Sequence, residues 1–313
     1  MAKIIEWVAA LRGTAVLLVF ASHQYWGIED DGLNQVLGRS GVAIFLLMAG
    51  YLSCISVQKK TTGQYIWNRF LRLYPVYWLL MTMVFFLSHA FSITEYFKNL
   101  TLFQEYLGAR HILHHSWMLS ILIMLYGMIL IMKKDLRRWI PIAFMVCAVG
   151  SLGFAILRYL TGLHFPTAIF LLLQEGLLGG MIQQGNGFSK KPKVYLLIFE
   201  VTLIISTLLS YPLALAIEYI IAYNIGIALF VLFMKKDIHL KVFAWMGMLG
   251  FTMFLGDIIP VVVINRIVPA MRHLPIAPTI LYHFIAAILF SYIITKFIEQ
   301  PLLKWGKRVE KNV

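Results

Sequence analysis

The chain has 313 residues, of which 60% are hydrophobic and only 13% are charged. Because soluble domains average about 25% charged residues, this composition excludes an ordinary soluble domain and indicates a membrane protein. The net charge of +13 would also suit a nucleic-acid-binding protein. Here the basic residues lie in short loops between apolar runs, as membrane topology requires, so we expect no nucleic-acid partner. The only cysteines, Cys54 and Cys147, lie within apolar runs and predict neither a disulfide framework nor a metal site.

Ten apolar runs follow one another along the chain, and each is about as long as a transmembrane helix. In a bilayer each segment must satisfy its own backbone hydrogen bonds, so the runs are predicted to be α-helices. The first run contains ionisable residues and lacks a small-residue cleavage site, so we interpret it as a retained helix and not as a signal peptide. The predicted spans are residues 7–26, 40–57, 73–91, 114–132, 139–159, 165–183, 193–211, 213–234, 242–265 and 278–298.

The basic residues are distributed unequally between the two sides of these spans. With ten spans, 20 of the 27 lysine and arginine residues fall on one side and six on the other, with Arg12 inside the membrane. The richer side is expected to be cytoplasmic, which places both termini there. The predicted fold class is therefore all-α, a polytopic membrane protein of about ten transmembrane helices in which residues 1–313 form a single domain.

Arg12 and His23 are ionisable residues inside the first span, where charged groups are costly and are usually functional. Eleven residues separate them, so the helix brings both to nearly the same face, roughly 16 Å apart along its axis. Arg12 is expected near the cytoplasmic surface and His23 toward the outer side. The alternative is that Arg12 extends to the lipid headgroups and His23 is a satisfied core histidine. Their shared face favours a connected functional path.

Arg69 and Arg72 lie three residues apart just before the third span. This spacing puts both guanidinium groups on one side of a helical turn at the cytoplasmic interface. Guanidinium forks bind phosphate oxygens bidentately, so the pair indicates an anion site. The alternative is ordinary anchoring of a membrane helix by basic residues.

The longest predicted outer connection covers about residues 92–113. It mixes apolar residues such as Ile93, Phe97 and Leu102 with polar ones. We therefore expect a partly amphipathic segment that lies at the outer membrane interface. It is either a plain connector or a cover over an outward-facing site.

Four motifs, in this order, resemble those of the acyltransferase-3 family of integral membrane acyltransferases. Residues 12–23 resemble the family's arginine–histidine signature, and residues 41–51 resemble its second-helix motif. Residues 69–75 are similar to its paired-arginine motif, and residues 291–301 resemble its closing helix and tail. The resemblance covers about residues 5–305, which is nearly the whole chain.

This resemblance implies a membrane O-acyltransferase, commonly an O-acetyltransferase, of the bacterial cytoplasmic membrane. Such an enzyme takes an acyl group from cytoplasmic acyl-CoA, usually acetyl-CoA, and transfers it to a hydroxyl group at the outer face. The implied acceptor is a cell-envelope or exported glycan, or a lipid-linked saccharide. No metal is implied, membrane lipids are the other partners, and a homo-oligomer is left open.

The resemblance also implies roles for the basic residues. Arg12, Arg69 and Arg72 are expected to hold the anionic nucleotide end of CoA, so that the pantetheine arm extends along the first helix toward His23. A neutral His23 would act as general base, removing the acceptor hydroxyl proton as the oxygen attacks the thioester carbonyl. Direct transfer is the simpler expectation, and a covalent acyl intermediate is the alternative.

The sequence departs from the family pattern in the fourth span. Trp117 lies in a motif in which a carboxylate is expected to follow, but residues 121–123 are aliphatic. Glu175, an intramembrane acid of the sixth span, is a candidate to replace that carboxylate. His115, Trp117 and Glu175 are our candidates for binding the acceptor. The alternative is that the histidine is simply interfacial and the glutamate is a structural group.

A second departure lies in the ninth span. Asp257 stands where the corresponding family motif usually ends in histidine. As a catalytic partner, Asp257 would orient His23 and raise its basicity, as the carboxylate of a catalytic triad does. The alternative is a solvated carboxylate at the outer interface.

Two other functions are compatible with the sequence. A transporter or flippase of a glycan or lipid would explain buried charges in a polytopic protein. Such folds usually contain inverted repeats with paired broken helices, and no matched pair is found in the two halves. A non-catalytic acyltransferase-like membrane domain would explain the missing carboxylate of the fourth span. Uptake of a glycan lipid without acyl-CoA would identify a transporter. CoA binding without turnover would identify a non-catalytic domain.

Overall fold

A computed structural model of the chain describes residues 6–24, 32–163, 167–185, 190–269, 271 and 274–311. Every regular element within these residues is helical, which confirms the predicted all-α class. The α-helices are α1 (Glu6–Ser22), α2 (Gly32–Lys59), α3 (Thr62–Ser88), α4 (Ile93–Leu100), α5 (Trp117–Ile131), α6 (Leu136–Thr161), α7 (Thr167–Gln184), α8 (Lys190–Ser210), α9 (Leu213–Lys236), α10 (Lys241–Gly256), α11 (Ile258–Ile267), α12 (Ile276–Ile294) and α13 (Gln300–Lys311). Two 3₁₀ turns, η1 (His114–Ser116) and η2 (Met132–Asp135), and one π-helix, η4 (Thr295–Glu299), connect them.

Each of the ten predicted spans overlaps with at least one of these helices. By length and apolar composition, six helical segments of the described chain are able to cross a membrane, or seven if α10 and α11 form one bent span. In that count η1, α5, η2 and α6 make up a single segment of 48 residues. The described part of α1 has 17 residues, fewer than the roughly 20 that span a bilayer. The number of about ten spans and the cytoplasmic termini therefore stay predictions.

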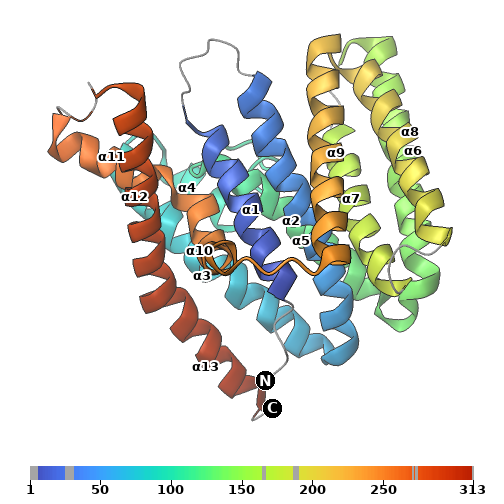
Figure 1. Cartoon of the computed structure of the whole chain (residues 1–313), viewed down its shortest axis with the longest axis horizontal. Coiled ribbons are helices and arrows are strands. Elements are labelled where there is room, and N and C mark those ends of the chain that lie inside the picture. Colours follow the sequence, from blue (N-terminus) through green and yellow to red (C-terminus); the bar gives the residue numbers. More distant parts are fainter. Residues whose placement is uncertain are drawn as a thin grey trace.

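Helices α1 and α2 occupy the middle of the bundle (Figure 1). Helix α2 packs on α7 and α9, and α6 and α8 lie beyond them. On the other side α1 packs on α10, which contacts α12 in turn. Helix α1 thus lies between the two groups of helices, and its Arg12 lines a cavity inside the bundle.

Helices α1 and α10 approach closely because glycine residues lie where their backbones meet. Gly13 faces the backbone carbonyl of Phe243, and a side-chain carbon at Gly13 would overlap that carbonyl. Gly247 faces the carbonyl of Ala9 in the same way. Small residues at such contacts allow membrane helices to pack backbone against backbone. This packing fixes the end of α10 relative to α1.

The connection between α3 and α5 is only partly an interfacial segment. Helix α4 is amphipathic, as expected, with Ile93 and Phe97 exposed and Asn99 buried. Beyond α4, however, Leu102 and Ile112 are buried in the main hydrophobic core. The connection therefore folds into the protein, where its polar backbone needs partners.

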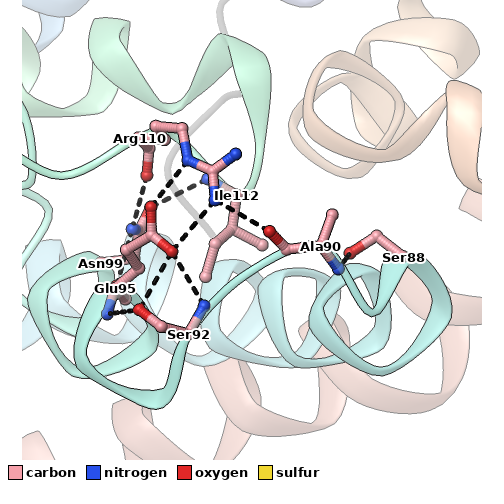
Figure 2. Close-up of polar contacts among 7 residues, drawn as sticks. All are labelled: Ser88, Ala90, Ser92, Glu95, Asn99, Arg110 and Ile112. Atoms are coloured by element: carbon pink, nitrogen blue, oxygen red, sulfur yellow. Dashed lines mark hydrogen bonds and ion pairs between the residues drawn. The ribbon is translucent and has the colours of Figure 1, made fainter.

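Arg110 supplies some of these hydrogen-bond partners, as Figure 2 shows. Its Nε donates to Glu95 Oε1 at 2.7 Å, and its Nη2 donates to the carbonyl of Ala90 at 2.8 Å. Glu95 also forms a capping box with Ser92 at the start of α4. The hydrogen bonds from Arg110 and from the Ser92 N–H lower the pKa of Glu95 from 4.5 to about 2.

Asn99 is the buried centre of the same network (Figure 2). Its Nδ2 donates to the carbonyls of Glu95 and Arg110 at 2.8 and 2.9 Å, and its Oδ1 accepts from the Ile112 N–H at 3.1 Å. The hydroxyl of Tyr77, on α3, donates to the Asn99 carbonyl at 2.8 Å. The network therefore ties α3 and α4 to the chain that leads into η1.

The glycine contact between α1 and α10 predicts a local penalty for a single added methyl group. Gly13→Ala should lower the thermal unfolding temperature of the protein in lipid nanodiscs, because overpacking of this kind costs about 1–3 kcal/mol. Gly153→Ala is the matched control: it also lies inside a helix, α6, but an added carbon there meets open space. Equal unfolding temperatures for the two variants would contradict the close contact.

The Arg110–Glu95 ion pair predicts a second outcome, in the mobility of α4. Glu95→Gln should increase amide hydrogen exchange in α4 and around Ile112, measured by mass spectrometry. Glu95 has a lowered pKa, so its stabilising effect is present above about pH 4.5 and is lost only as the pH falls toward about 2. The difference between variant and wild type should therefore persist from pH 8 to about pH 5. Glu105→Gln is the control: this exposed acid of the same connection makes only a long ion pair with His111, at 4.0 Å, so exchange should change far less than in Glu95→Gln.

Candidate active site

His23 and Asp257 lie in direct contact although 234 residues separate them in the chain. His23 follows the last residue of α1, and Asp257 lies between α10 and α11, which are bent by 62° relative to each other. His23 Nδ1 lies 2.6 Å from Asp257 Oδ2. Because a carboxylate accepts hydrogen bonds, Nδ1 carries the proton and the lone pair of a neutral ring lies on Nε2.

The carboxylate of Asp257 is buried, with only 4% of its side chain exposed, whereas His23 is 16% exposed. Its second oxygen, Oδ1, has no hydrogen-bond partner among the described residues. Burying a carboxylate is costly unless it is paired, so the contact with His23 is the main compensation for Asp257. The alternative of a solvated, interfacial Asp257 does not fit this environment.

His115 lies against the other face of the site. Its ring stacks on that of His23 with the centroids 4.1 Å apart and the planes 14° from parallel. His115 belongs to η1, at the end of the connection that Asn99 holds. Its ring also lies 6.0 Å from that of Phe254, on α10. The structure thus brings together His23, Asp257 and His115 from three distant segments.

A cavity of about 530 Å³, here called the histidine cavity, opens beside these rings. Its lining includes His23, His114, His115, Trp117, Arg39, Asn34, Tyr219, Tyr223 and Phe254. Two of the three predicted acceptor-binding residues, His115 and Trp117, are therefore adjacent to the predicted base. The size of the cavity is within the range of small-ligand pockets.

A second cavity, of about 280 Å³, contains the three predicted CoA-binding arginines and is here called the arginine cavity. Arg12, Arg69 and Arg72 all line it. The guanidinium carbon of Arg69 lies 4.3 Å from the centroid of the Tyr126 ring, a cation–π contact that orients the group. Among the described residues none of the three arginines forms an ion pair, so the cavity carries an excess of positive charge.

Glu299 is the single acidic residue in the described lining of the arginine cavity. It ends the π-helix η4, and its Oε2 accepts hydrogen bonds from Thr252 and Thr295 at 3.2 and 3.3 Å. Sequence reasoning did not identify Glu299 as a site residue. Its position in the closing motif was visible, but the irregular helix that turns it toward the arginines was not.

Phe254 lines both cavities. It belongs to α10, three residues before Asp257, and its ring also packs on Phe45 of α2 at 5.5 Å between centroids. The two cavities therefore meet at one aromatic side chain. The arginines and the His23–Asp257 pair lie on opposite sides of that junction.

Glu175 does not belong to either group. It is fully buried in α7, lines neither cavity, and neither of its carboxylate oxygens has a partner among the described residues. The sequence predicts that Glu175 binds the acceptor together with His115 and Trp117. In the structure Glu175 does not line the cavity that contains those two residues. The ionisable groups closest to its buried carboxylate are those of Glu200, on α8, and of Tyr223, on α9, and Tyr223 itself lines the histidine cavity.

Comparison with known proteins adds one finding. A family model described as an acyltransferase domain matches residues 5–298, which is nearly the whole chain. No curated protein and no solved structure matches the chain significantly. The match includes α1, the paired arginines and Asp257, and the described chain contains helices long and apolar enough to cross a membrane. The chain is a membrane acyltransferase and belongs to the acyltransferase-3 family.

Proposed function

We propose that the protein is an acyl-CoA-dependent O-acyltransferase, with acetyl as the simplest acyl group and a cell-envelope or exported glycan as acceptor. The observation that carries this proposal is the meeting of two chemically different cavities at Phe254. One offers three arginines against a single carboxylate, and the other offers a histidine paired with a carboxylate. A donor with phosphates at one end and a thioester at the other matches that arrangement.

The donor end of the proposal rests on charge. Three arginines and one carboxylate line the arginine cavity, and buried charges of one sign need a counter-charge. The phosphates of CoA would supply it, through bidentate hydrogen bonds to guanidinium groups. A cavity of about 280 Å³ is small for a whole CoA molecule. We therefore place the phosphates and the pantetheine arm inside it and the adenosine outside.

The chemical step follows from the geometry of His23. Nε2 takes the proton from the acceptor hydroxyl as the hydroxyl oxygen attacks the thioester carbonyl carbon. Asp257 holds the reactive tautomer and stabilises the imidazolium that forms. When the tetrahedral intermediate collapses, the carbon–sulfur bond breaks and the CoA thiolate takes the proton from the imidazolium. The products are the acyl ester and CoA with a free thiol.

The acceptor is proposed to enter the histidine cavity, where His115 and Trp117 line the wall. Under the proposed topology this cavity opens to the outer side of the bacterial cytoplasmic membrane, and the arginine cavity opens to the cytoplasm. Residues 1–313 would act as one catalytic domain. A purely binding domain would have no use for a histidine with its Nδ1 held 2.6 Å from a buried carboxylate.

The His23–Asp257 pair predicts a defined loss of activity. His23→Ala and Asp257→Asn should each reduce acyl transfer from labelled acetyl-CoA to envelope glycans by on the order of 10²-fold or more. Asp257→Asn should keep the wild-type unfolding temperature within a few degrees in nanodiscs, whereas His23→Ala should lower it, because it leaves the Asp257 carboxylate buried without its partner. His239→Ala, an exposed histidine at a distant helix end, serves as the control. Normal acetylation of envelope glycans by the His23→Ala variant, measured by mass spectrometry, would show that the general-base role is wrong.

The arginine cavity predicts an effect confined to the donor. Arg72→Gln should raise KM for acetyl-CoA about tenfold or more, because a charge-assisted hydrogen bond to phosphate is lost. The KM for the acceptor should change little. Arg138→Gln removes an exposed arginine that lies outside both cavities and should leave both KM values unchanged. An unchanged KM for acetyl-CoA in the Arg72 variant would show that the donor does not bind in the arginine cavity.

A further inference from the structure

Arg39, on α2, is the one residue with a permanent charge in the described lining of the histidine cavity. No carboxylate is among the described residues that line this cavity: Asp257 contacts His23 but is not part of the lining, and Glu218 is not part of it either. The other polar side chains of the wall are neutral amides, phenols and imidazoles. The described residues of the wall therefore offer only neutral or positively charged side chains, and this favours a ligand that carries negative charge.

The guanidinium group of Arg39 is held by α9. Its central carbon lies 3.8 Å from the centroid of the Tyr219 ring, a cation–π contact. Tyr219 in turn stacks on Tyr211 with centroids 4.8 Å apart and planes 18° from parallel. One nitrogen, Nη1, donates to Glu218 Oε2 at 3.1 Å. The side chain is thus fixed on one face and at one nitrogen before any ligand arrives.

These contacts leave hydrogen-bonding capacity on Arg39. A guanidinium group has five N–H donors, and the described contacts are hydrogen bonds to Glu218 and Tyr219, so donors remain for a ligand. The pair with Glu218 is half-buried, with 20% and 23% of the two side chains exposed, so it compensates the charge only in part. A preorganised guanidinium fork of this kind binds planar or tetrahedral anions, such as a carboxylate or a phosphate.

Asn34 is a second residue of this wall that has an unused hydrogen-bond acceptor for a ligand. Its Oδ1 is buried and has no hydrogen-bond partner in the described chain, whereas its Nδ2 donates to the carbonyl of Gln24 at 3.2 Å. Both Asn34 and Arg39 line the histidine cavity. A ligand that donates a hydroxyl proton to Asn34 and presents an anion to Arg39 would satisfy both.

We infer that the histidine cavity selects an acidic sugar as acceptor: Arg39 binds its carboxylate or phosphate, and Asn34 accepts from one of its hydroxyl groups. This inference rests on the proposed function, because it names the class of acceptor that His23 activates. Arg39 acts here as a specificity-determining residue. Its role differs from that of an oxyanion-stabilising residue, which would act on every acceptor equally.

The test compares three small acceptor probes with the purified protein in nanodiscs. The probes are methyl glucoside, which is neutral, methyl glucuronoside, which carries a carboxylate, and glucose 1-phosphate. Acetyl transfer from labelled acetyl-CoA gives kcat and KM, and calorimetric titration of each probe gives binding without turnover. We expect at least one anionic probe to bind and react about tenfold or more better than the neutral one. The better of the two identifies carboxylate or phosphate as the recognised group.

Substitution of Arg39 then tests whether this residue causes the preference for anionic probes. Arg39→Gln should raise KM and the dissociation constant for the anionic probe about tenfold or more and leave those of methyl glucoside within about threefold. Arg39→Lys should recover part of the preference, since it keeps the charge but not the fork. Arg158→Gln is the matched control: Arg158 packs on Tyr211 of the same stack, 5.0 Å from its centroid, but does not line the cavity.

Three results would overturn the inference. One is equal binding of neutral and anionic probes to the wild type, and another is an anion preference that survives in Arg39→Gln. The third is an equal fall in kcat for all probes in that variant, which indicates oxyanion stabilisation instead. If no variant transfers acetyl to any probe, the proposed function is in doubt, but calorimetry still decides whether Arg39 selects an anion.

Discussion

A carboxylate inside a membrane protein is stable only if something nearby compensates its charge, and the arrangement around Asp257 follows from that requirement. The residue lies at the bend between α10 and α11, almost fully buried, and His23 is the partner that the structure provides. For the two side chains to meet, the end of α1 must lie against the end of α10. The glycines at positions 13 and 247 make this possible, because they allow the two helix backbones to touch. Packing and chemistry therefore depend on the same helix pair.

Helix α1 also separates two kinds of electrostatic environment. Near its beginning, Arg12 joins two arginines of α3 in a cavity with excess positive charge. At its end, His23 lies in a cavity whose wall is aromatic and polar. Phe254 of α10 borders both. A long donor that is anionic at one end and reactive at the other would occupy such a pair of cavities along the axis of α1, so binding of its phosphates and alignment of its thioester would be linked.

Local sequence patterns were sufficient to predict the helices and part of the site. Hydrophobicity and length predicted a helix in every apolar run, because a backbone in lipid has few other ways to form its hydrogen bonds. The spacing of Arg12 and His23 predicted their common helix face, and both line cavities in the interior. Asp257 was anticipated as a partner of His23 from its place in a motif. The contact itself could not be derived, since it depends on how α1 packs on a helix more than 200 residues away.

Long-range contacts account for what the sequence did not reveal. The stacking of His115 on His23 depends on the Asn99 network, whose members are scattered over α3, α4 and the following chain. Arg39 was one basic residue among six assigned to the outer side, and only its contacts with α9 distinguish it. Glu299 faces the arginines because η4 is a π-helix, an irregularity that hydrophobic periodicity does not encode. Glu175 shows the converse case: this intramembrane acid was a reasonable site candidate, but it is buried in α7 and lines neither cavity.

The position of Phe254 also matters for the permeability of the membrane. Two polar cavities that joined freely across a bilayer would form a water-filled conduit, and ions would flow through it down a potential worth about 2.3 kcal/mol per charge for every 100 mV. Apolar constrictions resist wetting and so block such leakage. Among the described residues Phe254 is the one side chain that lines both cavities, and its phenyl ring would provide a constriction of this kind. An acyl chain, being apolar, would displace the ring more readily than a hydrated ion would, so the same residue would pass the substrate and retain the ion gradient.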